Sequence, residues 1–164
     1  MKNYKWMLLL CVCLSTLAGC NNTDDVQKIF TGKTWRLNYI TQKNGHEMFN
    51  FWGNNEAARV ESMKLLSNPR NYQINFSGAA TDDIINGNIS GTVVMAKING
   101  TWSANARNQK FNAAVKADVT EKDVLAQRFI ELLNSVDSYS GDEHNLYLYY
   151  ENLSMVFYVV PSNN

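Results

Sequence analysis

Alternation of apolar and polar residues near the end of the chain constrains the fold more than any other feature of the sequence. In NLYLYYENLSMVFYVV, residues 145–160, Leu146 and Leu148 fall on one side of an extended chain, whereas Tyr147 and Tyr149 fall on the other. Successive side chains of a β-strand point to opposite faces of its sheet. The segment therefore predicts an antiparallel hairpin with one aliphatic face and one tyrosine face.

The same period of two recurs earlier in the chain. Apolar residues alternate with polar ones in residues 30–40 and again in residues 71–78, so each segment predicts a strand. Residues 84–117 have the pattern of a β-meander. Within them, the dipeptides Asn86-Gly87 and Asn99-Gly100 are typical of tight turns because such pairs tolerate a positive φ.

Two segments have helical spacing instead. Residues 120–138 begin with Thr120 and carry Asp123 three positions later, which is a variant of the capping box. Residues 54–68 are followed at once by Pro69, a residue that commonly ends a helix. The positions at helical spacing in the shorter segment are Ala57, Val60, Met63 or Lys64, and Leu66 or Leu65. Those in the longer segment are Leu125, Phe129, Leu132 or Leu133, and Val136.

Together these patterns predict one α+β domain over residues 29–164. We expect a predominantly antiparallel, curved sheet with one long and one shorter helix packed against it. The aromatic residues with the spacing expected of a core are Trp35, Trp102, Phe111, Phe129 and Phe157.

Residues 1–19 have the layout of a secretory signal peptide, in which Lys2 and Lys5 precede an apolar run and then small residues. The run is shorter than the roughly 20 apolar residues of a membrane-spanning helix. The sequence Leu-Ala-Gly-Cys ending at Cys20 resembles the bacterial lipobox, in which the cysteine thiol receives a diacylglyceryl group and the cysteine becomes the first mature residue. We therefore expect a lipid anchor on Cys20. Ordinary cleavage after Ala18 is the alternative.

The polar residues 20–28 predict a short flexible tether between the lipid and the domain. Their Asp24-Asp25 pair resembles the early acidic cluster that directs lipoproteins of Bacteroides-type bacteria to the outer face of the cell, and it equally suits a solvated linker. We expect a lipid-anchored protein of the outer membrane that faces either the periplasm or the exterior.

Removal of the signal peptide changes the chemistry that the chain offers. Cys11 and Cys13 are lost and Cys20 becomes a thioether, so the mature chain of 145 residues keeps no free thiol for catalysis, disulfides or metal binding. Loss of Lys2 and Lys5 from 15 basic residues leaves 13 against 15 acidic ones, a net charge of −2. Because the basic residues are also scattered, we expect no nucleic-acid partner.

The order of these elements resembles the META domain of bacterial envelope lipoproteins, a lipocalin-like family. The resemblance lies in the hydrophobic spacing of GKTWRLNYI, INGTWSANARNQKFNAAV, LAQRFIELLNSVDSY and GDEHNLYLYYENLSMVFYV. It implies a compact antiparallel sheet with helices against it, and it implies no enzymatic activity.

The exposed aromatic residues are the best candidates for a binding site. Trp52 lies in the aromatic segment MFNFWGNN, and Tyr147 and Tyr149 share the outer face of the final hairpin. Aromatic faces on a wet surface stack against sugars or hold a partner protein. The alternative for Tyr147 and Tyr149 is that they merely cover the sheet.

No catalytic set stands out in the sequence. The pair His46-Glu47 and the segment GDEH, residues 141–144, place histidine beside acidic groups, but a zinc site requires three or four ligands at fixed spacing. The GDEH segment is either an exposed polar turn or a calcium-like oxygen site formed by Asp142 and Glu143. A small hydrolase centred on His144 or on a carboxylate pair is the alternative function. The candidate carboxylates are those of Glu47, Glu56, Glu131 and Glu151.

The sequence therefore favours a non-enzymatic lipoprotein of the cell envelope, with no cofactor and no metal. Such a protein binds a partner protein, a glycan or a small ligand, or serves a structural or stress-related role in the envelope.

Overall fold

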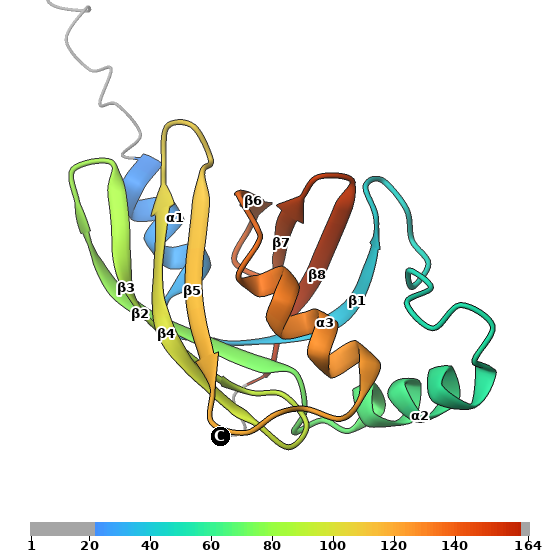
Figure 1. Cartoon of the computed structure of the whole chain (residues 1–164). Coiled ribbons are helices and arrows are strands. Elements are labelled where there is room, and N and C mark those ends of the chain that lie inside the picture. The colour runs from blue at the N-terminus through green and yellow to red at the C-terminus, as the bar shows by residue number, and fades with distance from the viewer. Residues whose placement is uncertain (1–21, 162–164) are drawn as a thin grey trace, which may run out of the picture.

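The computed structural model describes residues 22–161 and contains one eight-stranded antiparallel sheet with three helices packed against it (Figure 1). The expected α+β class with a curved, mainly antiparallel sheet is confirmed. The predicted signal peptide and Cys20 lie outside the described residues. The elements are α1 (Asn22–Phe30), β1 (Thr34–Gln42), α2 (Glu56–Ser67), β2 (Gln73–Thr81), β3 (Ile84–Thr92), β4 (Lys97–Asn105), β5 (Phe111–Ala117), α3 (Val124–Leu133), β6 (Ser138–Gly141), β7 (Asn145–Tyr150) and β8 (Leu153–Val159).

The sheet curves strongly but does not close. Its strand order is β5-β4-β3-β2-β1-β8-β7-β6, so β5 and β6 are the two edges. The edges meet only near one end, at the single bridge between Lys110 and Ser138. Along the rest of β5, α3 covers the opening, and the side chain of Asn134 bonds both the backbone N–H and the carbonyl oxygen of Val115 at 2.7 and 3.3 Å. These bonds satisfy part of an edge that would otherwise be open to pairing.

Helices α1 and α3 lie inside the curve of the sheet, and α2 lies across one end (Figure 1). The ring of Phe30, at the end of α1, contacts four other aromatic rings from strands β2, β4, β5 and β6. The centroid distances are 5.1 Å to Phe76, 4.7 Å to Trp102, 5.5 Å to Phe111 and 5.0 Å to Tyr139. The five aromatic residues expected in the core are all buried.

Helix α1 corrects the prediction of a flexible tether for residues 22–28, whereas residues 20 and 21 of that prediction lie outside the described residues. Thr23, Val26 and Phe30 recur at helical spacing and are buried against the meander. Burial of a phenylalanine side chain contributes about 1.5–3 kcal/mol. The apolar stripe of α1 is short, and its first members are small or polar. The composition of this segment therefore resembles that of a linker.

The two Asn-Gly dipeptides lie inside strands, which corrects their prediction as turns. Gly87 pairs with Gly78 and Trp102, and Gly100 pairs with Ile89. A Cβ atom on Gly87 would lie 1.9 Å from the carbonyl oxygen of Ser77, so the bare backbone allows neighbouring strands to coil closely. These glycines allow the strands to curve and to approach one another closely, and they do not reverse the direction of the chain.

The other predicted strands are confirmed, with one shift of register in β1 and one strand, β6, that was not predicted. A shift between Leu37 and Tyr39 in the pairing of β1 with β8 moves the buried side of β1 from odd to even positions, so that Ile40 faces the core. In the final hairpin, Leu146 and Leu148 are fully buried, as expected. The short edge strand β6 has no clear alternation and was not predicted.

Both predicted helices form, with different details at their ends and faces. Helix α3 begins at Val124 and is capped by Asp123 rather than by Thr120, because the Asp123 carboxylate accepts the N–H of Ala126 at 2.9 Å. In α2 the buried residue is Ser62, whereas Val60 is 58% exposed, so the predicted apolar stripe is displaced. No helix within residues 22–161 is long and apolar enough to cross a membrane.

Candidate functional site

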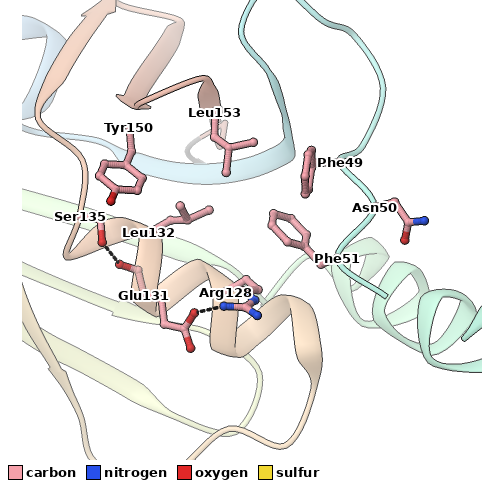
Figure 2. A pocket seen from close by; sticks show the side chains of 9 residues that line it. All are labelled: Phe49, Asn50, Phe51, Arg128, Glu131, Leu132, Ser135, Tyr150 and Leu153. Atoms are coloured by element: carbon pink, nitrogen blue, oxygen red, sulfur yellow. Dashed lines mark hydrogen bonds and ion pairs between the residues drawn. The ribbon is translucent and has the colours of Figure 1, made fainter. Parts of the chain in front are cut away.

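An aromatic groove lies between α3, the β7–β8 turn and the loop that joins β1 to α2. It has a volume of about 420 Å³, within the range of small-molecule sites. Figure 2 shows Phe49 and Phe51 from the loop on one side, Tyr150 and Leu153 from the hairpin above, and Leu132 of α3 between them. The rings of Phe49 and Phe51 are 4.8 Å apart at a tilt of 56°.

The polar members of the groove come mainly from one face of α3. Arg128 Nη1 donates to Glu131 Oε2 at 2.5 Å, and the Ser135 hydroxyl donates to the backbone oxygen of Glu131 at 2.9 Å. All three side chains are exposed. The groove therefore combines an apolar interior with a charged but internally paired rim.

The loop that carries the two phenylalanines is held by its own backbone. The N–H of Phe49 donates to the Ile40 carbonyl at 2.7 Å, which fastens the loop to β1. The Asn50 amide donates to Gly53 O at 3.0 Å and accepts the N–H of Trp52 at 3.1 Å. These bonds within the protein hold the wall of the groove in place.

Trp52 ties the same loop to the interior. Its Nε1–H donates to Ser62 Oγ at 2.9 Å, and the Ser62 hydroxyl donates to Asp123 Oδ2 at 2.5 Å. Asp123 Oδ1 also accepts the Tyr72 hydroxyl at 3.0 Å. This buried chain links the loop, α2, α3 and the start of β2.

Burial, followed by the neighbouring Asp123 carboxylate, raises the pKa of Tyr72 far above its ordinary value, so the hydroxyl stays a donor. Tyr72 also has a φ of 55°, a backbone conformation that bulky residues rarely adopt. Its N–H and carbonyl oxygen bond Val93 and Leu37, and these bonds hold the residue in that conformation.

The structure corrects the expected exposure of Trp52 and separates it from the two tyrosines. Trp52 is 7% exposed and belongs to the core, so its ring is not a free surface for a ligand. Tyr147 and Tyr149 lie half-buried on the outer face of β7, as predicted. Tyr149 shares a hydrogen bond of 2.7 Å with Ser140, and the Lys43 amine lies 5.8 Å from the centre of its ring. Neither tyrosine lines the groove.

The GDEH segment forms a turn at the surface. Asp142 Oδ1 accepts the backbone N–H groups of His144 and Asn145 at 2.7 and 2.8 Å. These bonds, that from His144 above all, lower the pKa of Asp142. Within residues 22–161 no three histidine, cysteine or acidic side chains are grouped so that they could hold a metal ion.

The candidate catalytic carboxylates do not share a protected site. Each of the four glutamates is exposed. Glu56 and Glu131 are paired with Arg59 and Arg128. Glu151 lies in the β7–β8 turn with a φ of 51°.

Sequence reasoning missed the residues that line the groove. The signal was present in MFNFW, where three aromatic residues gather in a loop between a strand and a helix. Trp52 was selected from this cluster, whereas its neighbours Phe49 and Phe51 face the groove.

The fold and the groove define a class of small α+β domain in which an open, curved antiparallel sheet encloses helices. The chain belongs to the family described as a domain of unknown function, DUF4847, whose model matches residues 21–160. The expected membership of the META, lipocalin-like family is not confirmed.

A solved structure supports the same fold. The chain is similar to a DUF4847 family protein from Bacteroides vulgatus ATCC 8482, whose crystal structure was determined at 1.00 Å resolution. The match has a TM-score of 0.61 and 22% sequence identity, and it covers 81% of this chain and 96% of the other. At this identity the likeness shows the fold alone. Comparison with curated proteins finds no match.

Proposed function

We propose that this protein is a non-catalytic lipoprotein of the bacterial cell envelope that binds a small ligand in the aromatic groove. The observation that carries the proposal is the groove of about 420 Å³, with phenylalanine, tyrosine and leucine inside and polar side chains at its rim. Sites that bind small molecules combine apolar walls with a few polar groups in this way.

The lipobox-like sequence ending at Cys20 supports the envelope location. In this proposal the lipid on Cys20 holds the chain at the outer membrane. The described part of α1 begins at Asn22, two positions after that cysteine in the sequence. The domain then lies close to the membrane surface rather than at the end of a long tether.

Ligand binding is tested with a variant that fills the groove and a matched control. Ser135→Trp places an indole in the groove, whereas Ser67→Trp places one at the end of α2. The two serines are comparable because each is exposed and each hydroxyl donates to a backbone oxygen of a helix, that of Glu131 in α3 at 2.9 Å and that of Lys64 in α2 at 2.7 Å.

The chain from residue 21 is incubated with a protein-free envelope extract and washed, and the molecules released on unfolding are identified by mass spectrometry. We expect one species to be retained, chemically unchanged, by the wild type and by Ser67→Trp and lost from Ser135→Trp. Equal retention by Ser135→Trp, or no retained species at all, would contradict the proposal.

Location is tested separately by labelling cells with a radioactive fatty acid. The wild-type protein should be labelled and recovered with the outer membrane, whereas Cys20→Ser should be neither. An unlabelled wild-type protein in the soluble fraction would remove the lipoprotein part of the proposal.

A further inference from the structure

A second hollow lies along the loop between β1 and α2, next to the groove. This hollow has a volume of about 540 Å³ and includes His46 and Glu47. Phe49 and Asn50 belong to both hollows. The two therefore adjoin along the loop, and each by itself has the volume of a small-molecule site.

The linings of the two hollows combine aromatic faces with hydrogen-bonding groups. The first hollow offers Phe49, Phe51 and the ring of Tyr150, with Arg128, Glu131 and Ser135 beside them. The second offers the polar side chains of Gln42, His46 and Glu47 together with Met48. Donors and acceptors are both present, because guanidinium groups donate, carboxylates accept, and hydroxyl and amide groups do both.

A fully apolar ligand fits this lining poorly. Arg128 and Glu131 keep further donors and acceptors beyond their mutual bond, and water can reach them because both side chains are exposed. An acyl chain in the groove would displace that water without offering hydrogen bonds in return, and such burial of polar groups is costly. A sugar ring satisfies both kinds of surface. Its C–H faces pack on aromatic rings, and its hydroxyl groups lie around its edge, where they both donate and accept.

The charges indicate a neutral ligand. The Arg128 guanidinium is already paired with Glu131 at 2.5 Å, so it presents little unbalanced positive charge to an anion. The second hollow adds the carboxylate of Glu47 and no lysine or arginine. An acidic polysaccharide or a phosphate group would therefore meet repulsion rather than a cation clamp.

Resting on the proposed function, we infer that the ligand of the groove is an uncharged oligosaccharide of at least two rings. One ring packs against Phe49 and Phe51, and the chain extends past the loop into the hollow beside His46.

The first experiment distinguishes the chemistry of the occupant. The envelope extract is treated with periodate, which cleaves the vicinal diols of sugars, or with lipase, or with protease before it is offered to the protein. We expect periodate alone to abolish retention of the groove-dependent species, whose mass should correspond to linked neutral sugars. A species that survives periodate, or that lipase or protease destroys, overturns the sugar assignment while leaving groove binding intact. Loss of all groove-dependent retention from untreated extract would instead be failure of the proposed function.

The second experiment measures length. The retained oligosaccharide is purified and trimmed to its single-ring and two-ring forms, and binding is measured by titration calorimetry. The two-ring form should bind at least about tenfold more tightly than the single ring. His46→Trp, which fills the second hollow at an exposed position, should remove that advantage. Equal affinities for both forms, or a His46→Trp variant that still favours the longer form, would refute the two-hollow arrangement.

Discussion

Asp123 accepts hydrogen bonds from three parts of the fold. Its replacement by asparagine removes the acceptor for one of them, the bond from the Ser62 hydroxyl. Its Oδ1 atom accepts the Ala126 N–H and the Tyr72 hydroxyl at 2.9 and 3.0 Å, and Oδ2 accepts the Ser62 hydroxyl at 2.5 Å. An asparagine keeps an acceptor for the first two and remains a good helix cap. Its amide NH₂ faces Ser62, whose oxygen already accepts Trp52 Nε1–H at 2.9 Å. The Ser62 proton then has no acceptor.

The expected cost follows from this arrangement. Ser62 is fully buried, so its unpaired hydroxyl proton costs about 1–3 kcal/mol. Asp123→Ala should cost more, because it also removes the cap, worth about 1 kcal/mol, and the acceptor of Tyr72. The ranking of stability is therefore wild type, then Asp123→Asn, then Asp123→Ala.

Urea unfolding followed by tryptophan fluorescence at pH 7 measures these differences. For a loss of about 2 kcal/mol and a slope of about 2 kcal/mol per molar urea, the midpoint falls by roughly 1 M. The double variant Ser62→Ala with Asp123→Asn lacks the orphaned proton, so its cost should be smaller than the sum of the two single costs. An Asp123→Asn midpoint equal to the wild type, or strict additivity in the double variant, would refute the reasoning.

Three further predictions concern other parts of the fold. Gly87→Ala should lower the free energy of unfolding by about 1–3 kcal/mol, because its Cβ would lie 1.9 Å from the Ser77 carbonyl oxygen. Urea unfolding measures this loss. An unchanged free energy of unfolding would show that the strands can separate freely. Glu121→Ala should destabilise the β3–β4 turn, since one carboxylate oxygen of Glu121 accepts three backbone N–H groups at 2.8–2.9 Å. The expected result is faster amide exchange at Met95 and its two neighbours. Unchanged exchange would exclude a role of Glu121 in holding the turn. Burial raises the pKa of Tyr139 from 10.0 to about 12. The unfolded chain therefore ionises this tyrosine first, and the free energy of unfolding should fall as the pH rises from 10 to 12. Tyr139→Phe should reduce that fall, and a pH profile identical to that of the wild type would contradict this prediction.

The strands could be predicted from sequence because their information is local. In the final hairpin, alternation fixes which residues face inward, and Leu146 and Leu148 are indeed fully buried. The α3 stripe is equally local, so Leu125 and Phe129 were placed correctly. The cap of α3 was misplaced by three residues, because the choice between Thr120 and Asp123 depends on tertiary partners such as Ser62.

The predictions that were wrong concern residues whose structure depends on contacts with distant parts of the chain. Gly87 has the local signature of a turn, yet its pairing with Gly78 and Trp102 makes it a strand residue. Val26 and Phe30 give α1 only a short apolar stripe, and the aromatic rings that cover Phe30 come from strands far along the sequence. Local propensity cannot register such contacts.

The groove is the extreme case of this dependence on distant contacts. Phe51, Leu132 and Tyr150 come from a loop, a helix and a strand, and no spacing rule connects them. Their meeting depends on where α3 lies in the opening of the sheet and on how the loop is fastened. The Trp52–Ser62–Asp123 chain provides that fastening one residue from Phe51, whose ring lies 6.1 Å from that of Trp52.

The network that stabilises the fold therefore also positions the site. Asp123→Asn should loosen the loop before it unfolds the domain, because the weakened bond reaches Trp52 through Ser62. Under native conditions this predicts faster amide exchange at Trp52 and Asn55, whose N–H groups bond within the loop at 3.1 Å, than in the central strand β1. Ligand affinity should then fall in a variant that touches no groove residue. If exchange rises equally in the loop and in β1, the network supports only global stability, and the groove wall is fixed by its backbone bonds alone.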